Sequence, residues 1–174
     1  NSANGNQIGE PLDCESSINA LAVSQDEKRI AIGGFGGNIS IWNIEDRKWL
    51  TFKPLKGEIK GIVNSIAFSP DGSYLLVGSD ALLAKMFRIS DSKLVSTFEN
   101  QSNVVSVGFS SDSKRIFTLG IDKSLKVWDL HPVQTYFDDT DKHPQYAGVM
   151  SNDGKLIASG GHNGIVRIWS TETK

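Results

Sequence analysis

The residues best suited to chemistry stand near the end of the chain, where His143 and His162 are accompanied by Asp141. Imidazole nitrogens and a carboxylate can bind a metal such as zinc, which takes three or four such ligands. His131 precedes a proline, and a surface loop is expected there. Two histidines and one aspartate on loops are more typical of solvated residues than of a metal centre, so neither a metal nor a cofactor is expected.

A glycine-rich segment, residues 33–37 (Gly-Gly-Phe-Gly-Gly), is the second candidate, because such loops can cradle phosphate groups. A phosphate site needs a helix directly after the loop, with its N-terminal amides facing the anion. Residues 38–42 have the pattern of a strand, which favours a tight turn between strands instead. The sequence also lacks the hydrolase, zinc-peptidase and nucleotide-binding motifs Gly-x-Ser-x-Gly, His-Glu-x-x-His and Gly-Lys-Ser/Thr. No catalytic residue is therefore expected, and the chain is not expected to be an enzyme.

The composition is that of a globular protein without a strong charge. The chain has 174 residues, 39% hydrophobic and 22% charged, with a net charge of -2. Such a balance predicts no attraction to nucleic acids or acidic membranes, and no apolar run is long enough to span a bilayer. A single cysteine, Cys14, indicates a reducing compartment, so a cytoplasmic location is expected. The first residue is Asn1 and not Met, which predicts a longer parent protein.

The chain contains an internal repeat. Four serines, here called the anchors, are spaced by 45, 41 and 41 residues: Ser24, Ser69, Ser110 and Ser151. An aspartate follows two residues after each anchor: Asp26, Asp71, Asp112 and Asp153. An aromatic residue follows eighteen residues after each anchor: Trp42, Phe87, Trp128 and Trp169. Repeats of about 40 residues are typical of solenoids and propellers.

Each repeat is predicted to contain four strands. Residues 69–72 (Ser-Pro-Asp-Gly) have turn chemistry, and short β-branched or aromatic segments precede and follow the turn. Second strands are predicted over 74–77, 115–118 and 156–159, and outer strands over 49–53, 94–98 and 133–137. Four strands per repeat predict an all-β protein built of propeller blades.

Two segments give the repeat a family resemblance. Residues 158–161 (Ala-Ser-Gly-Gly) with 165–169 (Ile-Val-Arg-Ile-Trp), and residues 125–129 (Leu-Lys-Val-Trp-Asp), resemble WD40 repeats. The resemblance implies a β-propeller of four-stranded antiparallel blades that spans residues 1–174. It divides the chain into an outer strand (7–13), blade 1 (14–58), blade 2 (59–99), blade 3 (100–140) and blade 4 (141–174). Similar arrays occur in multidomain bacterial and fungal signalling proteins, so a larger signalling parent is expected.

The sequence departs from the family pattern in its buried hydrogen-bond network. The family's histidine, ten residues before each anchor, is replaced by Cys14, Ile59, Asn100 and Asp141. Blade 3 keeps three of the four members, Thr118, Asp122 and Trp128. A network without one member leaves groups unpaired, at about 1–3 kcal/mol each, unless water or another donor compensates. Stability is therefore expected to come mainly from apolar packing between blades.

The N-terminal outer strand predicts how a ring could close. The last blade lacks an outer strand of its own, and the chain begins with a spare one. The strand completes the last blade either of the same chain or of a second chain. Three arrangements follow: a homodimer with an eight-bladed ring, a fragment of a larger propeller, and, less favoured, a four-bladed ring of one chain.

The family resemblance places the binding surface on one rim of the propeller. Eight residues are expected there, four from first strands and four from the following turns: Asn19, Phe35, Asn64, Asp80, Val105, Ile121, Tyr146 and His162. Half are apolar or aromatic, as a surface for a protein or peptide partner requires. The expected function is a non-enzymatic interaction scaffold or ligand-sensing module. One alternative is catalysis through Asp80 and His162. The other is nucleic-acid binding through Lys85, Lys126 and Arg167, which occupy the same position in three repeats; such a set of equivalent positions is called a column.

Overall fold

The chain forms four antiparallel β-sheets, blades 1 to 4 in chain order, and almost no helix. The computed structural model describes residues 10–14, 17–50, 58–130, 133–140, 144–162 and 164–171, with the backbone alone for Trp49 and for 133–140. Blade 1 contains β1 (Ile18–Val23), β2 (Arg29–Gly34), β3 (Ile39–Asn43) and β4 (Lys48–Leu50). Blade 2 contains β5 (Val63–Phe68), β6 (Tyr74–Ser79), β7 (Leu83–Arg88) and β8 (Leu94–Glu99). Blade 3 contains β9 (Val104–Phe109), β10 (Arg115–Gly120), β11 (Ser124–Leu130) and β12 (Val133–Thr140). Blade 4 contains β13 (Gln145–Met150), β14 (Leu156–Gly161) and β15 (Val166–Ser170). A short 3-10 helix, η1 (Phe35–Gly37), joins β2 to β3. The prediction of an all-β protein made of antiparallel blades is confirmed.

A serine and an aspartate close the turn between the first two strands of every blade. In blade 2, Ser69 Oγ donates to Asp71 Oδ1 at 2.5 Å and accepts from the Tyr74 amide at 2.9 Å. The Asp71 carboxylate also accepts from the Ser73 amide at 3.0 Å. Equivalent bonds recur at the other three anchors. The repeated columns in the sequence are therefore the residues that fix this turn.

The core lies between blades and not within them. Alternate residues of a strand point to opposite faces, so each inner blade has an apolar face toward each neighbour. Ile41 of blade 1 packs with Val63 and Leu75 of blade 2. Two further clusters join blade 2 to blade 3 and blade 3 to blade 4. Burying one such side chain contributes about 1.5–3 kcal/mol, so the expected apolar packing between blades is present.

A residue other than histidine completes the buried hydrogen-bond network of blade 3. In blade 3, Trp128 Nε1 donates to Thr118 Oγ1 at 3.2 Å, and Thr118 Oγ1 donates to Asn100 Oδ1 at 2.8 Å. Asn100 Nδ2 in turn donates to the Phe98 carbonyl at 3.1 Å. In blade 3 another residue compensates for the missing histidine, because Asn100 takes its place. Asp122 instead accepts from Ser124 Oγ at 2.6 Å.

Blade 2 avoids unpaired groups in the opposite way. The same three columns are occupied by Ile59, Val77 and Phe87, which are all buried in one apolar cluster. A buried site without polar groups needs no hydrogen bonds, so nothing is left unsatisfied. In blade 4, Trp169 Nε1 donates to Ser159 Oγ at 2.7 Å, which keeps one bond of the network.

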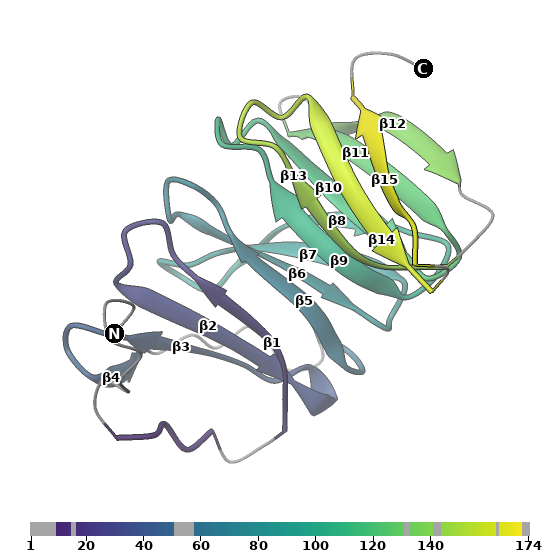
Figure 1. Cartoon of the computed structure of the whole chain (residues 1–174). Coiled ribbons are helices and arrows are strands. Elements are labelled where there is room, and N and C mark those ends of the chain that lie inside the picture. The colour runs from purple at the N-terminus through teal and green to yellow at the C-terminus, as the bar shows by residue number, and fades with distance from the viewer. Residues whose placement is uncertain are drawn as a thin grey trace.

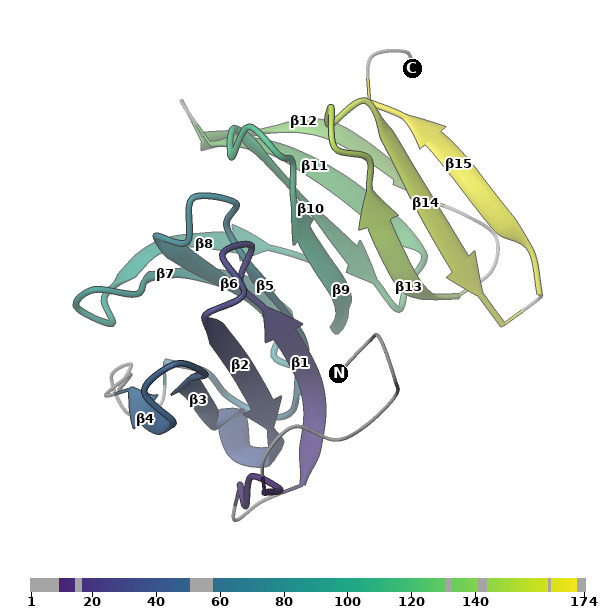
Figure 2. The same cartoon turned by 60° about the vertical axis from the view of Figure 1, so that its left-hand side comes forward.

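The four blades follow one another along an open arc. Their innermost strands β1, β5, β9 and β13 lie side by side in chain order (Figure 1). A view turned by 60° also shows blade 1 and blade 4 at opposite ends (Figure 2). The arc is open between these blades, so the structure is not a closed four-bladed ring. Of the predicted outer strand, residues 7–9 lie outside the described part and residues 10–13 form no strand. Its pairing stays a prediction.

Candidate protein-binding rim

A β-bulge interrupts the first strand of every blade at the same column. In β1, Ile18 and Ala20 pair with the adjacent residues Gly34 and Gly33, so Asn19 is the extra residue. The other three bulges place Asn64, Val105 and Tyr146 in this position. A bulge breaks the alternation of the strand and redirects a side chain, and bulges are frequent beside functional sites. The four first-strand residues predicted for the rim are therefore the four bulge residues.

The turn after the second strand lies beside each bulge, because the two strands are antiparallel. These turns contain the other four predicted residues, Phe35, Asp80, Ile121 and His162. Neighbouring blades are linked at this end, where Asn64 Nδ2 donates to the Val104 carbonyl at 3.1 Å. The structure thus brings the predicted residues to one end of the blades, which is called the rim below.

Blades 1, 3 and 4 each place one exposed apolar or aromatic side chain on the rim. Phe35, Ile121 and Tyr146 are between 43% and 50% exposed. The Tyr146 ring meets the His162 ring edge-on, with 6.3 Å between centroids and an interplanar angle of 89°. Exposed aromatic residues beside polar neighbours supply both the contact area and the orientation that a protein partner needs.

Two of the polar rim residues stabilise the rim itself. Asp80 Oδ1 accepts a hydrogen bond from the Ile62 amide at 2.7 Å. Gly61 has a φ of +73°, and a Cβ there would overlap the Asp80 carboxylate. Asn64 donates its side-chain hydrogen bond to the Val104 carbonyl.

One apolar rim residue faces inward. Val105 is half-buried and packs against the cluster between blades 3 and 4. Phe35, Ile121, Tyr146, Asn19 and His162 remain as the outward-facing members.

Leu82 is a rim residue that the sequence did not predict. It lies in the turn between β6 and β7 and is 46% exposed, with a φ of +64°. Positive φ is unfavourable for a residue with a Cβ, and apolar residues are unusual on such a turn. The same column holds Gly37 and Gly164, both with positive φ, and Lys123. In the sequence, Leu82 can be recognised as a candidate binding residue because the equivalent positions of the other repeats hold glycine or lysine.

Comparison with known proteins assigns the repeat. The WD40 family (WD domain, G-beta repeat) matches residues 6–43, 51–83, 92–129 and 143–170. The chain belongs to the WD40 repeat family. Pre-mRNA-processing factor 19 of Dictyostelium discoideum is 26% identical over 97% of this WD40 chain and 34% of its own length. WD repeat-containing protein 1-B of Xenopus laevis is 25% identical over 89% of the chain and 26% of its own length.

A further relative and a solved structure extend the comparison. The human U3 small nucleolar RNA-associated protein 18 homolog is 27% identical over 72% of the chain and 23% of its own length. The structure of U3-55K superposes with a TM-score of 0.80 and 22% identity, and the match covers 91% of this chain and 50% of that chain. The likeness to U3-55K establishes the fold. The WD40 chain spans about a third of the length of the first relative and about a quarter of the length of the second.

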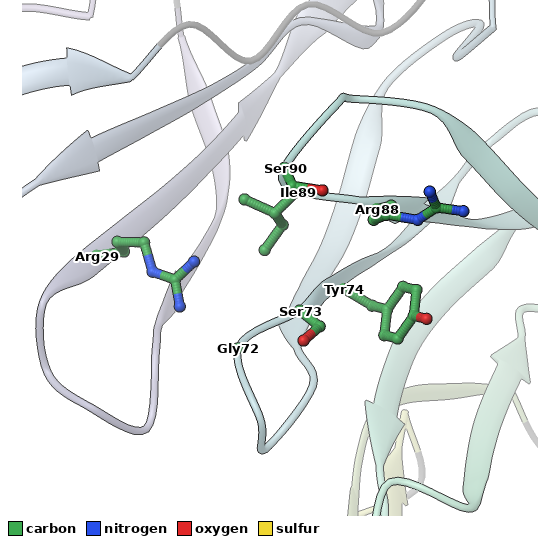
Figure 3. A pocket seen from close by; sticks show the side chains of 7 residues that line it. All are labelled: Arg29, Gly72, Ser73, Tyr74, Arg88, Ile89 and Ser90. Atoms are coloured by element: carbon green, nitrogen blue, oxygen red, sulfur yellow. The ribbon is translucent and has the colours of Figure 1, made fainter.

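A pocket between blades 1 and 2 is a second candidate site, at the end of the blades where the anchor turns lie. It has a volume of about 360 Å³, and Arg29 and Arg88 reach it from the two blades (Figure 3). Arg29 Nη2 lies 3.6 Å from Asp26 Oδ2, and its guanidinium lies over the Phe68 ring. Arg88 Nη1 lies 3.3 Å from Asp91 Oδ2. Because each arginine has its own carboxylate, the pocket does not offer an uncompensated cation to an anionic ligand.

The residues named for catalysis and metal binding either have other contacts in this WD40 chain or lie outside its described part. Asp80 is committed to the Ile62 amide, and His162 packs against Tyr146. No group of three His, Cys, Asp or Glu residues that could hold a metal is found among the described residues. His131, Asp141 and His143 lie outside them. In the same described part, no helix is long and apolar enough to cross a membrane.

Proposed function

We propose that this WD40 chain is a non-enzymatic scaffold that binds a protein or peptide on its rim. The observation that carries the proposal is the group of exposed apolar residues Phe35, Leu82, Ile121 and Tyr146 at one end of the blades. Asn19 and His162 lie beside them as exposed polar residues that can fix the register of a partner. A larger signalling parent and a cytoplasmic location stay part of the proposal.

A double variant tests the rim. Phe35→Ala with Tyr146→Ala in the parent protein removes two aromatic anchors, each worth about 2 kcal/mol or more at a binding hot spot. Partner binding is expected to weaken by about thirtyfold for each anchor and by several hundredfold for both, measured by pulldown and titration calorimetry. The matched control is Leu94→Ala with Val95→Ala in β8, where two apolar residues are exposed away from the rim. Unchanged partner recovery by a folded rim variant would overturn the proposal.

Nucleic-acid binding is the alternative that the relatives' names raise, since two are named for pre-mRNA processing and for small nucleolar RNA association. The basic column gives little support to nucleic-acid binding, because at least two of its three side chains already have partners. Lys85 Nζ forms an ion pair with Glu58 Oε2 at 3.1 Å, and Lys126 Nζ lies over the Trp128 ring. A protein partner is therefore favoured. Binding of RNA by the parent that persists in the rim variant would favour the alternative.

A complete ring is also part of the proposal, because the arc of four blades has two uncovered ends. Either a second copy of the chain or further blades of a longer polypeptide complete it. Both arrangements leave the rim accessible, since the rim lies at the end of the blades and not on their faces.

A further inference from the structure

The pocket between blades 1 and 2 uses two strand positions that hold an ion pair in blade 3. In blade 3, Arg115 of β10 stands opposite Asp129 of β11, and Arg115 Nε donates to Asp129 Oδ1 at 3.0 Å. Such a charge-assisted hydrogen bond between paired strands holds a guanidinium on its own blade. Blade 3 therefore shows how an arginine at this position lies when a carboxylate faces it.

Blade 1 has the arginine but not the carboxylate. Arg29 of β2 comes five residues after its anchor, as Arg115 does, and it stands opposite Asn43 of β3. Asn43 is uncharged, and its Oδ1 accepts a hydrogen bond from the Asp46 amide at 2.8 Å. No cross-strand carboxylate therefore holds the Arg29 guanidinium on blade 1.

The Arg29 side chain reaches across to blade 2. Its guanidinium carbon lies 5.5 Å from the centre of the Phe68 ring. A Cβ added at Gly72 would overlap the guanidinium, so the glycine leaves the room that Arg29 occupies. Figure 3 shows Arg29 pointing from blade 1 toward the turn that contains Gly72 and Ser73. Arg29 is therefore a wall of the pocket between the two blades.

The Arg29 guanidinium keeps its hydrogen-bond donors available. Its side chain is only 20% exposed, and its ion-pair partner Asp26 Oδ2 lies 3.6 Å from Nη2. That distance is longer than an N–H···O hydrogen bond, which measures about 2.7–3.2 Å. Within the described part of the chain, the five N–H groups of this guanidinium donate no hydrogen bond. A ligand with acceptor atoms can therefore satisfy them.

Blade 2 changes the same pair of positions in another way. Tyr74 of β6 stands opposite Arg88 of β7, so an arginine occupies the position that Asp129 has in blade 3. Arg88 Nη1 lies 3.3 Å from Asp91 Oδ2 in the turn after β7. The residues that line the pocket thus include two arginines and no carboxylate. Both arginines come from strand positions that have lost their cross-strand acid.

Donors beside compensating carboxylates favour an uncharged acceptor. Asp26 and Asp91 lie 3.6 Å and 3.3 Å from the arginine nitrogens, so they would repel an anionic ligand. A carbonyl oxygen accepts hydrogen bonds from a guanidinium without this repulsion. The hydroxyls of Ser73 and Ser90 can both donate and accept, and Ile89 adds an apolar surface. A peptide group, with one carbonyl and one N–H, matches this lining.

We propose that this pocket binds the carbonyl groups of an uncharged peptide segment of a partner protein, with the Arg29 guanidinium as the donor. Its volume of about 360 Å³ is within the range of ligand sites, roughly 300–1,000 Å³. The pocket lies at the end of the blades where the anchor turns are, and not on the rim. It is therefore a second binding site, and the inference does not depend on the rim.

Asn43→Asp tests the proposal by giving blade 1 the ion pair of blade 3. The new carboxylate faces Arg29 across the strands and keeps an oxygen for the Asp46 amide, so the blade should fold unchanged. Because the guanidinium is then held on blade 1, peptide binding is expected to weaken by about tenfold or more. The matched control is the reverse change in blade 3, Asp129→Asn, which should leave binding unchanged because Arg115 does not line the pocket.

Methyl NMR of the parent protein with labelled isoleucines measures the binding. The probe is the uncharged peptide N-acetyl-Ala-Ala-Ala-amide, and Ile89 in the pocket is the reporter. The Ile89 signal should shift with a dissociation constant on the order of 1 mM, as expected for a ligand of this size. Ile121 reports binding on the rim, and circular dichroism checks the fold of each variant.

Three results would overturn the proposal. One is the absence of a saturable Ile89 shift up to about 50 mM probe, including a shift of Ile121 alone, which would leave the rim proposal untouched. Another is equal affinity of the Asn43→Asp variant and the unmodified protein, since Arg29 would then not be the donor. The third is binding of inorganic phosphate, or of the same peptide with a free carboxylate, about tenfold more tightly than the amide, because the pocket would then be an anion site.

Discussion

At the scale of single residues, blades 2 and 3 each have an interior of one polarity at the positions of the buried network. Blade 3 encloses a continuous chain of hydrogen bonds from Trp128 through Thr118 to Asn100. Blade 2 has apolar residues in all three columns, with Val77 in the position of Thr118. Buried polar groups are costly unless all of them are paired, so either complete state is stable and a mixed state is not.

Thr118→Val tests this rule. The variant removes the hydroxyl that links Trp128 to Asn100 and leaves two buried polar groups without their partner. We expect a loss of about 1–3 kcal/mol in the free energy of unfolding, measured by urea denaturation. Val77→Thr is the matched reverse change, because it buries a hydroxyl in an apolar site, and it should also destabilise. A Thr118→Val variant as stable as the unmodified chain would contradict the rule.

The four turn aspartates predict an acid transition. Hydrogen bonds from the anchor serines are the main cause that lowers the pKa of Asp26, Asp71, Asp112 and Asp153 below 3.8. Since the lower pKa belongs to the folded state, their contribution is present above pH 3.8 and is lost as the pH falls through the folded values. The urea midpoint should therefore decrease below pH 3.8.

A double variant provides the control for this acid transition. Asp71→Asn with Asp112→Asn removes two of the titrating carboxylates, so its urea midpoint should depend less steeply on pH. Equal slopes for the variant and the unmodified chain would show that other groups cause the transition.

The sequence predicted which residues recur in the repeats but not which of them contact one another in the fold. The anchor serines, aspartates and aromatics were readable because they recur at fixed spacing. The role of Asn100 was not, because it depends on a distance of 2.8 Å to Thr118 across the fold. Blade 2 differs from the family pattern at all three positions together, with Ile59, Val77 and Phe87, so no polar group remains there to be paired.

At the scale of elements, the turn after each first strand is the unit that sets the repeat. Its fourth residue has positive φ in every blade: Glu27, Gly72, Ser113 and Gly154. Glycine adopts this conformation without strain, whereas a residue with a Cβ does so at a cost of about 1–2 kcal/mol. The turns of blades 1 and 3 therefore store strain that those of blades 2 and 4 do not.

Glu27→Gly should relieve this strain. The gain is reduced by the larger entropy of glycine in the unfolded chain, so we expect stabilisation of up to about 1 kcal/mol. Thermal denaturation measures it. Glu45→Gly is the comparison, since Glu45 is exposed and does not have positive φ. A lower melting temperature for Glu27→Gly would show that the turn is held by other contacts.

The sequence also predicted most strands but not their irregularities. Predicted second strands over 74–77 and 115–118 correspond to β6 and β10, which are longer by two residues at their C-terminal ends. The bulges at Asn19, Asn64, Val105 and Tyr146 were not predicted, because a bulge is a property of the pairing register between two strands. Only the structure explains why these four residues project onto the rim.

At the scale of the whole molecule, the two ends of the arc and the rim are separate surfaces. The end faces consist of strand residues that pack blade on blade, whereas the rim consists of bulges and turns. A variant of one surface should therefore leave the other unaffected.

The most direct test of the scaffold function is a hydrogen-exchange footprint of the parent protein with a partner recovered by pulldown. Binding on the rim predicts slower exchange at the amides of the turns 35–37, 80–82 and 121–123, with no change in β4 or β8. Protection confined to the outer strands, or to the pocket of Arg29 and Arg88, would contradict the rim as the binding surface.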